Sequence, residues 1–84
     1  MKLQPVKASQ IPTEQAIFSK GWEMLKTYYS LEQNSKEEDW EALVNEAQQL
    51  YRLGNTKPTE ALSKAIALGV LEYIELLSKE RKQP

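Results

Sequence analysis

Apolar side chains recur every three or four residues through most of the chain, which is the period of a helix that buries one face. The first such stretch follows Pro12, where Thr13 can cap a helix and Glu14 suits its positive end. Its apolar stripe contains Phe18, Trp22, Leu25 and Tyr29, widened by Ile17, Met24 and Tyr28. Gly21 within the stretch indicates a close approach by another backbone. The spacing predicts a helix over residues 13–32.

A second helix is predicted over residues 36–53. Ser35 and Glu38 have the spacing of a capping box, in which each side chain binds a backbone amide at the start of the helix. Apolar positions follow at helical spacing, and they are Trp40, Leu43, Val44, Ala47, Leu50 and Tyr51. Gly54 is expected to end the helix in the left-handed conformation. Because each of the two tryptophans lies on the apolar side of its helix, we expect both to pack in one core cluster.

A third helix is predicted over residues 58–80, with Pro58 in its first turn, where proline is tolerated. From Ala61 to Leu77, twelve of the seventeen residues are apolar, so most sides of this helix need a cover. Two short helices cannot supply it, which predicts either self-association as a homodimer or a docking face for another protein. The residues expected to carry this contact are Leu68, Val70, Leu71 and Leu76, with Gly69 allowing a close approach. The alternative is a helix wrapped by the N-terminal segment.

Residues 1–12 match neither a helical nor a strand period and contain two prolines. We predict an extended N-terminal arm, which Leu3, Val6 and Ile11 either pin to the body or leave as a frayed end. Short connections join the three helices, and no alternating run is long enough for a strand. The sequence therefore predicts an all-α three-helix bundle, with residues 13–84 forming a single domain.

The composition narrows the function. Of the 84 residues, 40% are apolar and 27% are charged, as in a soluble globular domain. The chain has neither Cys nor His, which excludes disulfides, thiol nucleophiles, the usual zinc sites and imidazole catalysis. There is no glycine-rich phosphate loop and no apolar run of membrane-spanning length, and we expect no signal peptide because no apolar segment follows the first charged residues. We predict a cytoplasmic protein that is not an enzyme and binds no cofactor, metal or membrane.

Charge is unevenly placed along the chain. The formal net charge is −1, yet residues 32–51 carry six acidic side chains and one lysine. Four of the acidic residues begin the second predicted helix, namely Glu37, Glu38, Asp39 and Glu41. They lack the alternating ligands and central glycine of a calcium loop, and a helix dipole favours their charged form, which argues against acid–base catalysis. With Tyr28, expected to be the exposed member of the adjacent tyrosine pair, they form the predicted surface for a protein partner.

Two other functions stay open. A small DNA-binding regulator would use the second and third helices as a helix-turn-helix, but Lys57 and Lys64 are the only cations near the start of the third helix. The pattern therefore disfavours direct binding to nucleic acid. A purely structural homo-oligomer is the other alternative, and it would form large assemblies without a heterologous partner.

Residues 18–80 resemble a group of small, uncharacterised helical proteins from phages and mobile elements of Gram-positive, gut-type bacteria. The resemblance is carried by packing residues in five stretches, Trp22-Glu23, Tyr28-Tyr29, Glu38 to Ala47, Leu50-Tyr51 and Ala67 to Glu75. It implies an accessory protein of a mobile element that acts by binding. By analogy with small phage proteins, the bound host protein would be inhibited, and an immune nuclease would be one example. The group supplies no active-site residues to transfer.

Overall fold

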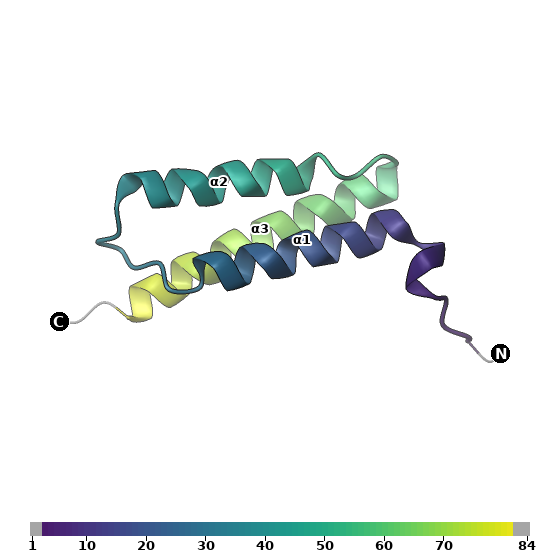
Figure 1. The fold of residues 1–84 in the computed structure, drawn as a ribbon, viewed down its shortest axis with the longest axis horizontal. Helices are drawn as coiled ribbons and strands as arrows, with labels where there is room; N and C mark the ends of the chain where they lie inside the picture. The colour runs from purple at the N-terminus through teal and green to yellow at the C-terminus, as the bar shows by residue number, and fades with distance from the viewer. Residues whose placement is uncertain (1–2, 82–84) are drawn as a thin grey trace.

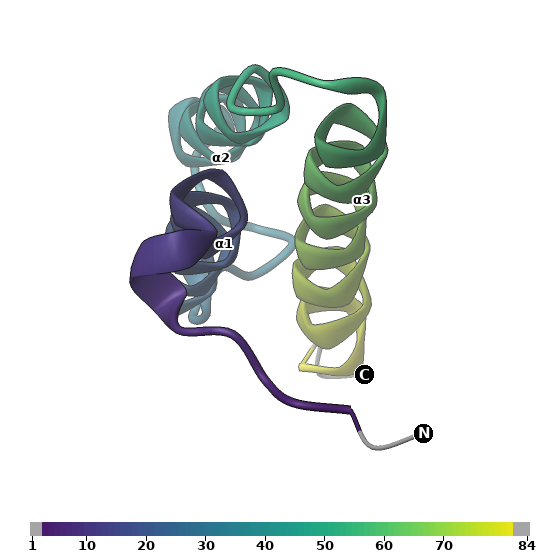
Figure 2. The ribbon, with the colours of Figure 1, turned by 90° about the vertical axis from the view of Figure 1, so that its right-hand side faces the viewer.

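The computed structural model of the chain describes residues 3–81, and it contains three α-helices after one short 3-10 turn. The turn η1 spans Ala8–Gln10, α1 spans Pro12–Tyr28, α2 spans Glu37–Tyr51 and α3 spans Lys57–Glu80. α1 and α3 run in the same direction, and α2, which connects the end of α1 to the start of α3, runs in the opposite direction (Figure 1). Seen from one end, α1 and α2 lie on one side and α3 on the other (Figure 2). The predicted all-α three-helix bundle is confirmed.

The core runs along the length of the bundle and contains side chains from all three helices and from the α1–α2 loop. Its buried apolar members are Ile17, Met24, Leu31, Leu43, Ala47, Leu50, Ala67 and Ile74. Burying one large aliphatic side chain contributes about 1.5–3 kcal/mol, so each of the larger members stabilises the fold by an amount of this order. A second set packs against the core while partly exposed: Leu25, Tyr28, Trp40, Leu62, Ile66, Val70 and Leu71.

The buried side of α3 is made mostly of small or polar residues. Its fully covered positions are Thr59, Ser63, Ala67, Ile74 and Ser78. The hydroxyls are satisfied by backbone carbonyls: Ser63 Oγ donates to the Tyr51 oxygen at 2.9 Å, and Ser78 Oγ donates to the Glu75 oxygen at 2.7 Å. Ile74 is the large apolar residue among these buried positions. Other large apolar residues of α3 lie on its flanks, and Leu68 and Leu76 stay 54% and 51% exposed.

Helix starts differ from the sequence predictions at two of three places. α1 begins at Pro12, so Thr13 lies inside its first turn and does not cap it. The capping box of Ser35 with Glu38 is wrong, because Ser35 Oγ accepts from the Glu32 amide at 2.9 Å within the loop, and α2 begins after Lys36 without a side-chain cap. α3 begins as expected around its proline. There Thr56 and Thr59 cap each other's amides.

Helix ends also carry corrections. α1 stops at Tyr28, four residues earlier than predicted, because the chain turns there and returns Leu31 to the core. α2 ends at Tyr51, and no residue among 3–81 adopts a positive φ, so the left-handed role of Gly54 is wrong. Gly54 is needed for another reason. A Cβ atom at this position would lie 2.6 Å from the Glu60 amide nitrogen at the start of α3.

The two remaining glycines behave differently. The approach of another backbone predicted at Gly21 is wrong, because the atoms nearest to a Cβ there all belong to side chains, and Ile66 Cγ2 of α3 would lie only 2.6 Å away. Gly69, by contrast, faces open space, with nothing within 4 Å of the position that a Cβ would take. Gly21 thus sets the separation of α1 and α3, whereas Gly69 takes no part in the packing of this chain.

The N-terminal arm leaves the bundle at the start of α1 (Figure 1). Leu3 is 88% exposed and Val6 is 58% exposed, so the prediction that these side chains pin the arm to the body is wrong. The arm also does not wrap α3, whose outer leucines remain half-exposed. Within residues 3–81, no helix combines the length and the apolar character that crossing a membrane requires.

Candidate functional site

The four acidic residues predicted to bind a partner are all exposed at the start of α2. Three of them, Glu37, Glu38 and Asp39, lie in the first turn, where the positive end of the helix dipole stabilises their charge. Within the described part of the chain, no group of acidic residues is arranged to hold a metal ion. The cluster therefore presents negative charge at the surface, spread around the helix and not gathered in one cavity.

One acidic residue does meet the predicted tyrosine. Asp39 and Tyr28 line the same hollow of about 280 Å³, at the junction of α1, the following loop and α2. The remaining lining residues are Thr27, Ser30, Leu31 and Ser35. The structure thus brings Asp39 and Tyr28 together, while Glu37, Glu38 and Glu41 lie outside this hollow.

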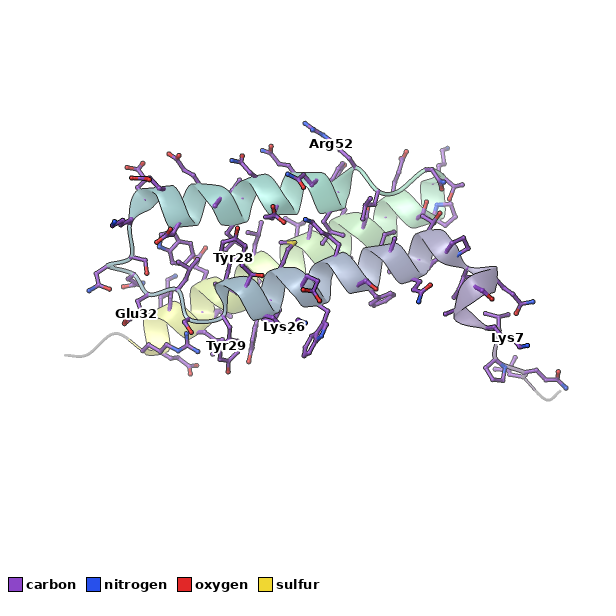
Figure 3. The ribbon with its side chains drawn as sticks, in the orientation of Figure 1. Lys7, Lys26, Tyr28, Tyr29, Glu32 and Arg52 are labelled. Carbon is purple, nitrogen blue, oxygen red and sulfur yellow. The ribbon has the colours of Figure 1, made fainter. Side chains whose placement is uncertain are left out.

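The exposed member of the tyrosine pair is Tyr29, so the prediction for Tyr28 is wrong. Tyr28 continues the core side of α1 and packs against the core, four residues after Met24. The two tyrosines project on opposite sides of α1 (Figure 3). The guanidinium of Arg81 lies 4.7 Å from the centre of the Tyr29 ring and also donates to the Tyr29 carbonyl, which ties the end of α3 to the end of α1.

The aromatic residues early in α1 also lie outside the core. Phe18 and Trp22 are 55% and 58% exposed, because the core side of α1 is centred on Ile17 and Met24. The predicted core cluster of both tryptophans is therefore wrong. Trp40 alone packs against the core, and its indole nitrogen donates to the Glu32 carbonyl at 3.1 Å.

These exposed rings border a shallow apolar groove between α1 and α3. The groove measures about 230 Å³ and is lined by Leu25, Ala65, Ile66, Gly69, Val70 and Tyr73. Phe18 precedes the groove residue Leu25 by seven positions, Trp22 precedes it by three, and Tyr29 follows it by four. At this helical spacing all three share the side of Leu25. We call the groove with these three residues the aromatic face. Sequence reasoning missed it because the helical period assigned these rings to the core.

A second apolar groove lies on the other side of α3, between α3 and α2. This α2–α3 groove measures about 170 Å³ and is lined by Val44, Ala47, Gln48, Tyr51, Lys64, Ala67, Leu68 and Leu71. It contains two of the four residues predicted for self-association. Val70 lies instead in the aromatic face, and Leu76 lines neither groove. The four residues therefore do not form one surface, because their spacing spreads them around α3.

The acidic residues extend the edge of the α2–α3 groove. Val44, Gln48 and Tyr51 line it from α2 at steps of four and three residues. Glu37 and Glu41 precede them at the same helical spacing, so both carboxylates lie on that side of α2, beyond the groove toward the N-terminus of the helix. The groove thus has an apolar floor and a negative end.

No protein-family model matches the chain, and no curated protein or solved structure matches it significantly. What the chain does is therefore inferred from its own surfaces. Two of these are apolar and aromatic, and they lie on opposite sides of α3.

Proposed function

We propose that the chain is a non-catalytic protein-binding module, and that the α2–α3 groove with its acidic end is the surface that binds a heterologous partner. The resemblance to small phage and mobile-element proteins supports a more specific form of this proposal. In that form the chain is a cytoplasmic accessory protein that binds a host protein, such as a nucleic-acid-handling defence enzyme, and inhibits it. The observation that carries the proposal is an exposed apolar groove continued by carboxylates.

The groove offers binding energy from apolar contact. Val44, Tyr51 and Leu68 are each about half exposed along it. Full burial of a leucine side chain contributes about 1.5–3 kcal/mol, so covering the open half of Leu68 alone would contribute roughly 1 kcal/mol. Tyrosine is enriched among the residues that dominate binding at protein interfaces. A partner that fills this groove gains most of its affinity here.

The acidic end sets the chemistry of the partner. Glu37 and Glu41 favour lysine or arginine side chains on the bound protein. A groove between two helices suits an amphipathic helix, with apolar residues every three or four positions. The partner that fits is therefore a helix with an apolar side and a basic end. A protein that handles nucleic acid carries basic surfaces of this kind.

Capture from host extract by the purified chain, with crosslinking and mass spectrometry, tests this proposal. Leu68→Glu places a charge in the groove, and the pair Glu37→Lys with Glu41→Lys reverses its acidic end. The matched control is Val6→Glu, at an equally exposed apolar position on the arm. Circular dichroism verifies that every variant is folded.

We expect a specific partner to be captured by the wild type and by the arm control, and to be lost by both groove variants. Equal capture by all four proteins would contradict the proposal. Salt-dependent binding of random duplex DNA by the wild type would instead favour the small DNA-binding regulator.

A further inference from the structure

The chain exposes more surface than a folded monomer of its size. Its accessible surface is 6540 Å², whereas a folded protein of 9.7 kDa exposes roughly 5,100 Å². The surplus is about 1,400 Å², and the exposed N-terminal arm contributes to it. A standard protein–protein interface covers about 800 Å² on each partner. One such contact therefore fits within the surplus.

The aromatic face has the composition of an interface. Phe18, Trp22 and Tyr29 of α1 and Tyr73 of α3 are all exposed, and apolar atoms line the groove between them. Aromatic residues are enriched at the centre of protein interfaces. The open space at Gly69 adds a position where a ring from another molecule can lie directly on the backbone of α3.

The two edges of the aromatic face carry charged side chains. On the α1 edge, the ammonium of Lys26 lies 5.7 Å from the centre of the Trp22 ring and is ion-paired with the Glu23 carboxylate at 2.8 Å. On the α3 edge, Glu72 follows the groove residue Gly69 by three positions, and it has no ion-pair partner among residues 3–81. When a copy of the face is turned by 180° about an axis along the helices, the Glu72 carboxylate of each copy faces the exposed Lys26 ammonium of the other, which can then bind Glu23 and Glu72 together.

The register of these two charges along the helices also agrees. α1 and α3 run in the same direction (Figure 1), and they meet where Gly21 faces Ile66. Lys26 lies five residues beyond Gly21, or about 7.5 Å along the axis, and Glu72 lies six residues beyond Ile66, or about 9 Å. The two charges therefore stand at nearly the same level on opposite edges.

We propose that the aromatic face is the interface of a symmetric homodimer in which α1 of each copy packs parallel to α3 of the other. In this dimer, Trp22 covers the partner's Gly69, and Lys26 pairs with the partner's Glu72. Both ion pairs form because the symmetry repeats each contact. The α2–α3 groove remains open on each copy, so the dimer presents two equivalent sites for the heterologous partner.

Sedimentation equilibrium at protein concentrations up to about 200 μM tests the dimer, since mass action then populates even a weak one. We expect the wild type to dimerise and Trp22→Glu to be monomeric. Leu68→Glu, in the other groove, should leave the dimer unchanged. A monomeric wild type would overturn the proposal, and so would a dimer that survives Trp22→Glu but is lost in Leu68→Glu.

Charge reversal tests the parallel arrangement. Lys26→Glu and Glu72→Lys should each weaken dimerisation by about tenfold or more, because each replaces two attractive pairs by two repulsive ones. The double variant should return to within about threefold of the wild type, and an equimolar mixture of the two single variants should form a heterodimer. Lys57→Glu makes the same charge change at the far end of α3 and should have no effect. Failure of the double variant to restore the dimer would overturn this arrangement.

Discussion

Replacing Gly21 by alanine probes the contact that sets the distance between α1 and α3. The added Cβ would lie 2.6 Å from Ile66 Cγ2, whereas carbon atoms in favourable contact are about 3.5–4.0 Å apart. Ile66 is branched at its β-carbon and holds one preferred rotamer in a helix, so this methyl group cannot rotate away freely. The helices must therefore separate locally, and the core side chains between them lose contact.

Two opposing effects decide how much Gly21→Ala changes the free energy of unfolding. Alanine is favoured over glycine within a helix by about 1 kcal/mol. Overpacking a core typically costs about 1–3 kcal/mol. We therefore expect Gly21→Ala to lower the free energy of unfolding by about 1 kcal/mol. In an Ile66→Ala background the clash is absent, and the next atoms, of Leu50 and Val70, are 3.8 and 3.9 Å away, which are ordinary contacts. There the same substitution should raise the free energy of unfolding by about 1 kcal/mol.

The assay is urea unfolding followed by circular dichroism for the wild type, both single variants and the double variant. All four are measured at one low protein concentration, because dimerisation would add to the apparent stability. The expected signature is a change of sign between the two backgrounds. If Gly21→Ala stabilised the wild type, or had equal effects in both backgrounds, the inferred contact between α1 and α3 would be refuted.

Three further predictions test the packing of the bundle. Ser63→Ala removes the bond to the Tyr51 carbonyl and leaves that oxygen unpaired, and it should lower the free energy of urea unfolding by about 1–2 kcal/mol. Thr59→Val removes the hydroxyl that accepts from the Asn55 and Thr56 amides just before α3, and a loss of about 1 kcal/mol should accompany faster hydrogen exchange of these two amides. Leu43→Ala, at a fully buried site, should lower the free energy of unfolding by about 2–5 kcal/mol, whereas Val44→Ala at the next, half-exposed position should lower it by less than about 1 kcal/mol. The melting temperature should therefore fall far more for Leu43→Ala. Equal effects at the two adjacent positions would contradict the assigned core.

The three helices were predictable because each keeps a helical apolar period over at least fifteen residues. Their ends were less so. The end of α1 depends on Leu31, which returns to the core only because α2 and α3 stand where they do. The Ser35 hydroxyl can accept from an amide of the helix that follows or from an amide of the loop before it. It accepts from the Glu32 amide in the loop, a bond that a capping pattern does not predict. The local pattern of apolar residues thus predicts which segments are helical, and tertiary contacts determine the residues at which the helices end.

The surfaces were harder to predict than the fold. The apolar residues of α1 form two neighbouring stripes, one through Ile17 and Met24 and one through Phe18 and Trp22. Both stripes have the helical period, and only the positions of the other helices decide which one is buried. The acidic start of α2 was predicted from sequence alone, but its alignment with the α2–α3 groove was not, because that depends on how α2 and α3 pack.

The small side chains on the inner side of α3 separate the residues that hold this protein together from those available to other molecules. Ser63, Ala67 and Ser78 fix the position of the helix, whereas Leu68, Tyr73 and Leu76 contribute little to its burial. The outer residues can therefore change, and with them the surface that α3 presents, without loss of the bundle. A new outer surface on this helix requires few compensating changes in the core.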